Sequence, residues 1–182
     1  PTLTCINITV SLDINGQYQI TNPHDLILST VDNCGAVVCG FDSTSPPTLF
    51  SCADLGDVYL PIVGMDVNGN MNQCTATVTV HDSVPPVALC QNITIQLDTS
   101  GNASITTTDV DAGSYDNCSI SLSASPLQFT CADAGVQPVT LVATDGSGNQ
   151  DSCIANVTVE DNIGPHACCM DVTVYLDQAG TG

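Results

Sequence analysis

Oxygen-bearing side chains at alternate positions are the feature of this chain that most directly suggests chemistry. The pattern occurs twice, in Asp66, Asn68 and Asn70 and again in Asp145, Ser147 and Asn149. Such spacing is typical of loops that bind Ca²⁺ through carboxylate and amide oxygens. The same residues also suit an ordinary hairpin turn, in which aspartate accepts backbone N–H groups and glycine adopts a positive φ. Both interpretations stay open, because neither segment supplies the further acidic ligand of a complete calcium loop.

The eleven cysteines are the second chemical feature. A cytosolic chain gains little from so many thiols, so they indicate an oxidising, extracellular or cell-surface location. Metal binding through sulfur is the rival interpretation, but the chain contains no Cys-x-x-Cys pair and only three histidines. We therefore expect structural disulfides.

Several side chains are candidate acceptors of glycans. Asn-x-Ser/Thr sequons occur at Asn7, Asn92, Asn102, Asn117 and Asn156. Ser43 and Ser83 follow aspartates in segments that resemble an Asp-Ser/Thr-aliphatic O-glycosylation pattern. The alternative explanation for the sequons is ordinary strand patterning, in which asparagine alternates with threonine.

Charge of a single sign restricts what the chain can bind. It has no lysine or arginine, 18 aspartates and one glutamate, and its formal net charge is −19. Nucleic acids and anionic membrane surfaces are excluded as partners, because both need cationic groups for neutralisation. No stretch approaches the roughly 18 apolar residues of a membrane-spanning helix, so we expect no membrane insertion.

Catalysis is not expected from these residues. Nucleophilic catalysis needs a base held against its nucleophile, and His24, His81 and His166 belong to no such pattern. Chemistry that depends on lysine or arginine is excluded by composition. The chain is predicted not to be an enzyme and to require no cofactor, with Ca²⁺ as the one ion for which it offers ligands.

An internal repeat organises these residues. Asp32-Asn-Cys34 returns as Asp116-Asn-Cys118, and the Phe-Ser-Cys-Ala-Asp segment at 50–54 returns as Phe-Thr-Cys-Ala-Asp at 129–133. The opening segment at 5–10 returns at 90–95 and more loosely at 169–174. Two complete repeats are predicted, followed by the opening of a third or a donor strand, with the boundaries 1–85, 86–164 and 165–182.

Each repeat has the pattern of short strands separated by turns. Ile93 and Ile95 alternate with polar residues, as do the apolar residues in 153–159, which predicts half-buried strands. Valine, isoleucine and threonine dominate, while strong helix formers are scarce. We predict an all-β fold of tandem immunoglobulin-like β-sandwich repeats of seven strands each, stapled by disulfides. The short linkers at 82–86 and 161–165, stiffened by proline, would arrange the repeats as a rod.

The first and last strands of each repeat carry one recurring pair of cysteines. In immunoglobulin-like sandwiches these strands run side by side and parallel, so Cys90 could meet Cys153. Cys5 and Cys74 would match them in the first repeat. A local bulge or kink is required, because Cys90 otherwise shares a face with the outward Asn92.

The other recurring cysteines are predicted to close short loops, in the pairs Cys34–Cys52 and Cys118–Cys131. Each such bridge contributes about 2–4 kcal/mol. Cys39 and Cys168 have no counterpart in the second repeat, so one hypothesis joins them between neighbouring units or chains. The alternative pairs Cys34 with Cys39 locally and leaves Cys52 to find another partner.

The recurring motifs resemble those of the hyalin repeat, an extracellular immunoglobulin-like adhesion module. The resemblance rests on Asp-Asn-Cys, on Asp-x-x-Gly-Asn before a late cysteine, and on Val-x-Val-x-Asp-x-x-Pro-Pro at the exit of the first repeat. The sequence departs from the animal form of the repeat in having Cys52 and Cys131 and in lacking tryptophan and basic residues. In these respects it looks like the tandem versions of the repeat in large bacterial surface proteins. The resemblance implies an extracellular, adhesive role.

A structural and adhesive protein is the function that these features predict, as a repeat segment or subunit of a cell-surface fibre that associates with neighbouring repeats or protomers. Asp82, Glu160 and Asp161 lie at the linkers, where cadherin-like repeats bind calcium between domains. The orphan strand at 172–176 could be donated to a neighbour's sheet. The alternative function is a carbohydrate-binding or protein-binding adhesin module that uses the loops between strands.

Overall fold

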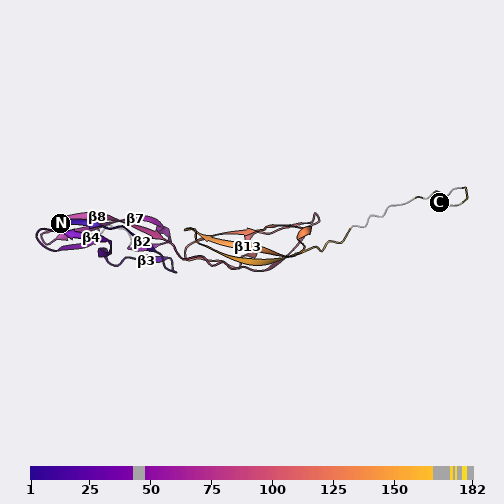
Figure 1. Ribbon diagram of the computed structural model, residues 1–182, viewed down its shortest axis with the longest axis horizontal. Coiled ribbons are helices and arrows are strands. Elements are labelled where there is room, and N and C mark those ends of the chain that lie inside the picture. Colours follow the sequence, from indigo (N-terminus) through magenta and orange to yellow (C-terminus); the bar gives the residue numbers. More distant parts are fainter. Residues whose placement is uncertain (43–47, 166–172, 174, 176–177, 180–182) are drawn as a thin grey trace.

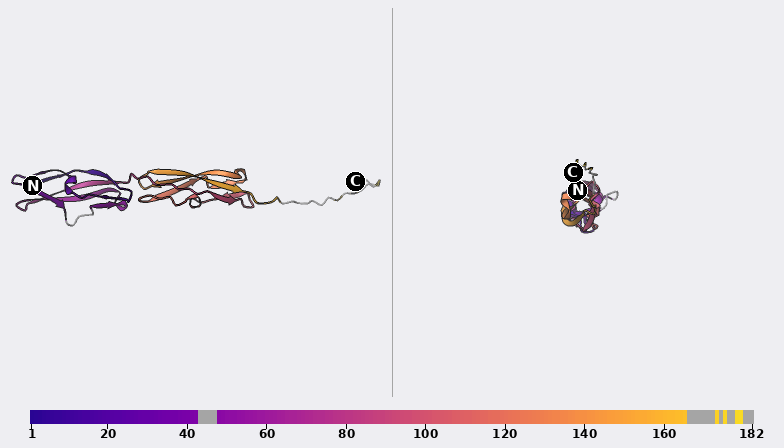
Figure 2. Two further views of the ribbon diagram at one scale, coloured as in Figure 1. Left: turned by 90° about the horizontal axis from the view of Figure 1, so that it is seen from below. Right: turned by 90° about the vertical axis from the view of Figure 1, so that its right-hand side faces the viewer.

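The computed structural model describes residues 1–42, 48–165, 173, 175, 178 and 179. Two units follow one another along its longest axis (Figures 1 and 2). The first unit contains strands β1 (Thr2–Cys5), β2 (Ile8–Ser11), β3 (Gln17–Gln19), β4 (Ile27–Val31), β5 (Val37–Phe41), β6 (Leu49–Ser51), β7 (Gly56–Asp66) and β8 (Met71–His81), with the 3-10 helices η1 (Pro23–Leu26) and η2 (Cys52–Asp54). The second contains β9 (Ile93–Gln96), β10 (Asn102–Ser104), helix α1 (Thr107–Val110), β11 (Ile120–Ser125), β12 (Gln128–Thr130), helix η3 (Cys131–Asp133), β13 (Gly135–Asp145) and β14 (Gln150–Glu160).

Each unit is built on one four-stranded sheet. The strand order is β2-β8-β7-β5 in the first unit and β11-β13-β14-β9 in the second. The long hairpins β7–β8 and β13–β14 are antiparallel, whereas the early strands β2 and β9 run parallel to the last strands β8 and β14. Smaller two-stranded sheets, β1-β4, β3-β6 and β10-β12, complete the units. The predicted all-β, immunoglobulin-like fold is confirmed.

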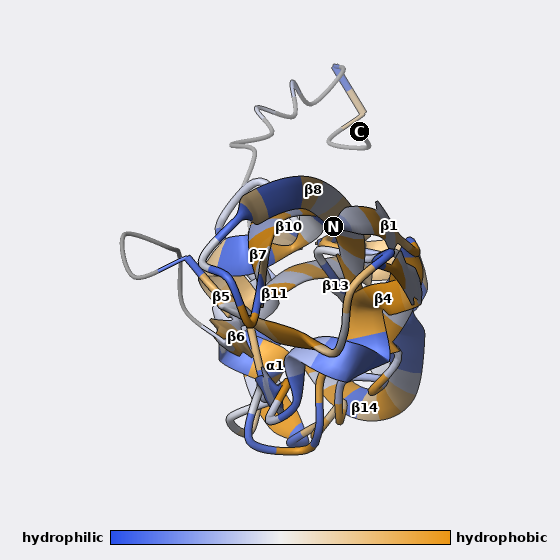
Figure 3. Cartoon of the chain, turned by 90° about the vertical axis from the view of Figure 1, so that its left-hand side faces the viewer, coloured by the Kyte–Doolittle hydropathy of each residue, from blue (hydrophilic) through white to orange (hydrophobic). Residues whose placement is uncertain are grey.

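Strand alternation places one hydrophobic core in each unit. Phe50 and Phe129 occupy equivalent, fully buried positions, and both cores also bury every second residue of the long hairpins. In β13, for example, Val139 and Leu141 are buried, and in β14 so is Val157. Hydrophobic and hydrophilic bands therefore alternate along the ribbons in Figure 3. No helix among the described residues combines the length and apolar character needed to cross a membrane.

The predicted kink near the first cysteine is present in both units. In the first unit it interrupts the strand at Ile6 and Asn7, so β1 pairs with β4 and β2 pairs with β8. The Asn7 Oδ1 atom accepts the N–H of Thr77 at 2.9 Å, and Asn92 Oδ1 likewise accepts the N–H of Asn156 at 2.8 Å. This side-chain acceptor replaces a missing backbone carbonyl where the chain changes sheets. The number of strands per unit consequently departs from seven: the described residues of the first unit form eight, and the second unit has six.

Two disulfides staple the units internally. Cys5 bonds to Cys74 and Cys90 bonds to Cys153, with Cα–Cα distances of 5.7 and 5.8 Å. These are the pairs expected from parallel first and last strands.

A third disulfide overturns the predicted loop bridges. Cys52 of the first unit bonds to Cys118 of the second, with a Cα–Cα distance of 5.5 Å. The predicted pairs Cys34–Cys52 and Cys118–Cys131 are therefore wrong, as is the local Cys34–Cys39 alternative, because Cys34, Cys39 and Cys131 are all free thiols. The physical reason is that these recurring cysteines lie at the two ends of a unit and meet only across a junction. Cys168, the proposed partner of Cys39, lies outside the described residues.

Candidate metal centre at the junction of the two units

The linker residue Asp82 is the centre of the junction. It is 1% exposed. Its Oδ1 atom accepts the backbone N–H of Val84 at 3.1 Å and the side-chain N–H of Asn117 at 3.2 Å. Its backbone carbonyl accepts the Nδ2–H of Asn149 at 3.0 Å. Two loops of the second unit thus hold the end of the first.

The Asp-Asn-Cys loop of the second unit reaches back into the first. Asp116 Oδ2 accepts the N–H of Cys118 at 3.0 Å, which shapes the loop. Asn117 Nδ2 donates to the carbonyl of Asp13 at 3.0 Å. Together with the disulfide from Cys118 to Cys52, these contacts connect the units independently of the linker.

Three carboxylates converge beside these contacts. One oxygen from each of Asp82, Asp116 and Asp145 lies within 4.8 Å of the other two. Asp82 and Asp145 are buried, and Asp116 is half-buried. Two carboxylate oxygens in this cluster, Asp82 Oδ2 and Asp116 Oδ1, are buried without a hydrogen-bond partner, and so is Asn117 Oδ1. Buried oxygens that accept nothing are costly unless a cation or a proton satisfies them.

The spacing of the three oxygens fits a divalent cation. Ca²⁺ binds oxygen ligands at about 2.3–2.6 Å, so two ligands on opposite sides of one ion are about 4.8 Å apart. An all-oxygen set excludes ions that prefer sulfur or imidazole. Mg²⁺ demands octahedral geometry and keeps several waters, whereas Ca²⁺ accepts irregular cages with protein ligands. The donor set therefore fits Ca²⁺ best.

Electrostatics also favour a cation here. At an effective dielectric constant of 20, two unit charges 4.8 Å apart repel by about 3 kcal/mol, and the cluster contains three such pairs. The chain has no lysine or arginine that could offset this repulsion. A bound cation would offset this repulsion.

The two hairpin segments predicted as calcium loops have different roles in the structure. Asp66 Oδ1 accepts the N–H groups of Asn68 and Asn70, both at 2.8 Å, and its Oδ2 accepts Asn70 Nδ2–H at 2.7 Å. Asp145 makes the matching bonds with Ser147 and Asn149. The side-chain amides of Asn70 and Asn149 each donate an Nδ2–H to their aspartate, so the nitrogen and not the oxygen of these amides faces the carboxylate. The hairpin alternative accounts for these residues, and only Asp145 also takes part in the carboxylate cluster.

Hydrogen bonding lowers the pKa of both hairpin carboxyls. For Asp66 the largest cause is the side-chain hydrogen bond from Asn70. For Asp145 burial raises the pKa, but hydrogen bonds from Asn149, Ser147 and Gly148 outweigh it and the net pKa is lowered. Both carboxyls are therefore held as acceptors in the charged form.

The structure places the remaining predicted site residues at different locations. Asp161 is exposed in the second linker, where its Oδ1 accepts the N–H of Ile163 at 3.1 Å. Among the glycan candidates, Ser83 and four of the asparagines are exposed, namely Asn7, Asn92, Asn102 and Asn156. Asn117 is half-buried, and a glycan on its Nδ2 would replace one of the two hydrogens that this nitrogen donates at the junction. Ser43 lies outside the described residues.

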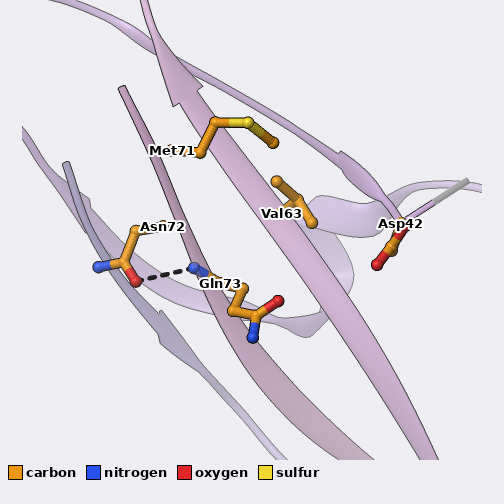
Figure 4. Close-up of a pocket in the computed structure, with 5 residues that line it drawn as sticks. All are labelled: Asp42, Val63, Met71, Asn72 and Gln73. Carbon is orange, nitrogen blue, oxygen red and sulfur yellow. Dashed lines mark hydrogen bonds between the residues drawn. The ribbon is translucent and has the colours of Figure 1, made fainter. Parts of the chain in front are cut away.

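A separate surface pocket on the first unit bears on the adhesin alternative. It measures about 330 Å³ and lies over β7 and β8, with the lining residues Asp42, Val63, Met71, Asn72 and Gln73 (Figure 4). Asn72 Oδ1 accepts the N–H of Gln73 at 2.8 Å across its wall. Its lining contains no aromatic ring on which a sugar could stack and belongs mostly to strands. This pocket does not favour a ligand site built from loops.

Acid is expected to destabilise the protein through capping carboxyls away from the junction. The pKa of Asp109 is lowered below its ordinary 3.8 by hydrogen bonds from the backbone and hydroxyl of Thr106. Stability from such a group is complete above pH 3.8 and is lost as pH falls through the lower folded pKa. Urea unfolding in chelator between pH 7 and 2.5 should show this loss. The Asp109→Asn variant should lose less stability over the same range; an identical pH dependence would contradict the assignment.

Comparison with known proteins gives similarity at the level of structure alone. No family model and no curated protein matches the chain. Among solved structures it is similar to human mucin-like protocadherin EC1-2, with 13% identity, a TM-score of 0.45, and coverage of 88% of this chain and 98% of that one. It is also similar to protocadherin gamma B2 extracellular cadherin domains 3–6, with 12% identity, a TM-score of 0.45, and coverage of 87% of this chain and 47% of that one. A third similar structure is the titin I-band fragment I67–I69, with 12% identity, a TM-score of 0.38, and coverage of 88% of this chain and 65% of that one. The chain thus resembles cadherin-like and immunoglobulin-like tandem domains, and the fold assigned above rests on its own strand pairing.

Proposed function

We propose that the chain is a load-bearing segment of an extracellular adhesive protein, in which repeats 1–85 and 86–164 form a rod stiffened by a disulfide and by Ca²⁺ at their junction. The observation that carries this proposal is the Cys52–Cys118 disulfide beside the carboxylate cluster. The hyalin-like motifs agree with a repeat segment of a large surface protein or fibre. Strand donation by 172–176 stays a prediction, since most of that segment lies outside the described residues.

The mechanical argument follows from the number of attachments. A linker alone leaves a second unit free to swing about one point. The disulfide adds a second covalent attachment, and Asn117 bridges the units with hydrogen bonds to Asp13 and Asp82. A cation held by Asp82, Asp116 and Asp145 would add a third attachment, because Asp82 belongs to the linker and the other two belong to the second unit. Bending would then require the loss of metal ligands.

The location argument rests on chemistry that favours the outside of a cell. Three disulfides persist in oxidising compartments. Extracellular modules bind Ca²⁺ with dissociation constants of about 10⁻⁴–10⁻³ M. An acidic surface without lysine or arginine suits self-association through such ions better than binding of nucleic acid or anionic lipid.

Small-angle X-ray scattering combined with calorimetric Ca²⁺ titration tests the proposal. In Ca²⁺ the chain should scatter as one extended particle and bind one ion at its junction. When the Cys52→Ser/Cys118→Ser double variant is measured in chelator, the distribution of its maximum dimensions should broaden toward shorter values. The Cys5→Ser/Cys74→Ser variant, which leaves the junction intact, is the control for general loss of a disulfide. No heat of Ca²⁺ binding up to 10 mM, or unchanged scattering of the junction variant, would refute the stiffened rod.

A further inference from the structure

The Asp116 carboxyl connects the carboxylate cluster to the disulfide between the units. Its Oδ2 atom accepts the N–H of Cys118, the residue that bonds to Cys52. Its Oδ1 atom is buried without a hydrogen-bond partner. One oxygen of this carboxyl lies within 4.8 Å of oxygens of Asp82 and Asp145. The same side chain therefore shapes the loop that carries Cys118 and supplies a ligand position for a cation.

Buried oxygens in this region point to a ligand independently of the number of carboxylates. Asp82 is 1% exposed, and its Oδ2 atom has no hydrogen-bond donor. Asn117 uses both hydrogens of its side-chain nitrogen, for the Asp13 carbonyl at 3.0 Å and for Asp82 Oδ1 at 3.2 Å. These bonds fix the orientation of the amide and leave its Oδ1 atom buried without a donor. A cation that prefers oxygen ligands can satisfy such atoms, whereas the chain has no lysine or arginine to do so.

The disulfide occupies a close fit between the units. Cys52 Sγ lies 3.8 Å from the carbonyl oxygen of Gly16 and 3.5 Å from that of Asn117. A Cβ atom added to Gly16 would lie 2.7 Å from Cys52 Sγ and 2.9 Å from the Asn117 carbonyl oxygen. The backbones of the two units therefore approach each other at this point with no room for one more carbon. A small shift of the loop at 116–118 would move Cys118 away from Cys52.

Hydrogen bonds in the first unit hold the other side of the disulfide in place. Ser51, which precedes Cys52, donates its N–H and its hydroxyl to Asp54 Oδ2 at 2.8 and 2.9 Å. Its Oγ atom accepts the N–H of Ala53 at 3.3 Å, so the start of helix η2 is closed by a capping box. Cys52 is thus presented by a well-bonded turn, and the position of the loop at 116–118 decides whether the two sulfurs meet.

Charge influences where that loop lies. When no cation is bound, the like charges of Asp82, Asp116 and Asp145 favour a larger distance between the linker and the loop. In the presence of Ca²⁺ the interaction changes sign, because each carboxylate is attracted to a shared centre. This attraction draws Asp116 toward Asp82 and so holds Cys118 near the first unit. Ion binding and disulfide formation favour the same arrangement of the junction.

We propose that Ca²⁺ binding and the Cys52–Cys118 disulfide are coupled through Asp116, each holding the junction in the arrangement that the other requires. The inference rests on the proposed function, because it uses the same carboxylate cluster as the Ca²⁺ site. Such a coupling is reciprocal. The factor by which reduction of the bond weakens Ca²⁺ binding equals the factor by which Ca²⁺ shifts the bond toward its oxidised form. In Ca²⁺ the junction therefore resists reductants that would open it in chelator.

Equilibration with dithiothreitol measures the coupling. One dithiothreitol molecule gives up two electrons and two protons and closes into a cyclic disulfide, while the Cys52–Cys118 bond breaks into two thiols. The full chain is used, with serine at Cys34, Cys39, Cys131, Cys168 and Cys169. Samples at graded ratios of reduced to oxidised dithiothreitol contain either chelator or about 10 mM CaCl₂, which exceeds the dissociation constants of extracellular Ca²⁺ modules, at equal ionic strength.

Trapping of the thiols with N-ethylmaleimide then reports each bond separately. Chymotrypsin, which cuts after aromatic residues and leucine, releases the two junction cysteines in peptides 51–55 and 116–122 for mass spectrometry. The ratio of reduced to oxidised dithiothreitol that opens half of the Cys52–Cys118 bonds should be at least about tenfold higher in Ca²⁺ than in chelator. The two disulfides within the units are internal controls, because neither includes a residue next to the cluster. Their ratios should change less than about twofold.

Calorimetry supplies the reciprocal measurement. The Cys52→Ser/Cys118→Ser variant should bind Ca²⁺ at least about tenfold more weakly than the wild type, because the loop is no longer held against the first unit. The Cys5→Ser/Cys74→Ser variant, which leaves the junction bond intact, should bind Ca²⁺ as the wild type does.

Asp116→Asn separates the two roles of this side chain. The variant retains an oxygen that can accept the N–H of Cys118 but lacks one charge of the cluster, so the difference between Ca²⁺ and chelator should largely disappear. Asp32→Asn is the matched control. Asp32 accepts the N–H of residue 34 at the same distance, 3.0 Å, and belongs to no described carboxylate cluster. This variant should keep the full difference.

The outcomes distinguish the coupling from the Ca²⁺ site itself. Equal dithiothreitol ratios in Ca²⁺ and in chelator for the Cys52–Cys118 bond would overturn the coupling, and so would an equal shift in all three disulfides. If calorimetry nevertheless records Ca²⁺ binding to the oxidised chain, the junction site of the proposed function stands and only the coupling fails. If calorimetry records no Ca²⁺ binding, both proposals fail. A full shift in the Asp116→Asn variant would contradict the role of this residue.

Discussion

Replacement of Cys90 and Cys153 together by alanine is expected to lower the free energy of unfolding of the second unit by about 4 kcal/mol. The bond closes a sequence separation of 63 residues, so its loss restores much conformational entropy to the unfolded chain. It also secures the early strand β9, which pairs with β14 along only four residues. Differential scanning calorimetry and urea unfolding should both report the loss.

The matched control is the Cys5→Ala/Cys74→Ala variant of the first unit, whose bond closes a separation of 69 residues. Each variant should shift mainly the transition of its own unit, because each disulfide lies within one hydrophobic core. If removal of the Cys90–Cys153 bond shifts both transitions equally, the two units unfold as one and the attribution to the second unit is wrong.

The Asp82→Asn variant is expected to bind Ca²⁺ at least about 100-fold more weakly than the wild type, which corresponds to about 2.7 kcal/mol at 25 °C. The substitution retains the size of the side chain and the acceptor for Val84, but removes one of three negative charges from the cluster. In chelator, where no Ca²⁺ is bound, the substitution should not lower the stability of the protein. The variant should then be at least as stable as the wild type, because Asp82 Oδ2 has no hydrogen-bond donor and one oxygen of this carboxyl lies close to two other carboxylates.

Asp161→Asn supplies the control in the single chain. Asp161 forms the same turn, from its Oδ1 to the N–H of Ile163, but is exposed and belongs to no described carboxylate cluster. Calorimetric titration and thermal melts in Ca²⁺ and in chelator should therefore match the wild type for this variant. Equal Ca²⁺ affinity of the Asp82→Asn variant and the wild type would show that the cluster is not the binding site.

The sequence by itself determined the properties that depend on local pattern. Alternation of apolar and polar residues identifies the buried faces of β13 and β14, because successive side chains of a strand point to opposite sides. The two disulfides within the units could also be predicted from the sequence, because the fold class places the first and last strands of a unit, which carry these cysteines, side by side. The absence of lysine and arginine, which excludes nucleic acids and anionic membrane surfaces as partners, is likewise a property of the composition alone.

Only the tertiary structure decided which residues meet at the junction. A repeat gives Cys52 and Cys131 identical local sequences, so nothing in the pattern distinguishes a bond within a unit from a bond to the next one. Asp116 was missed as a candidate ligand for the same reason, although its recurrence with Asp32 in Asp-Asn-Cys was the available signal. For the hairpin asparagines, the spacing of an amide does not reveal whether its oxygen or its nitrogen faces the aspartate, and in Asn70 and Asn149 it is the nitrogen that does. Distances across a junction depend on how two folded surfaces fit, and this fit involves residues far apart in the chain.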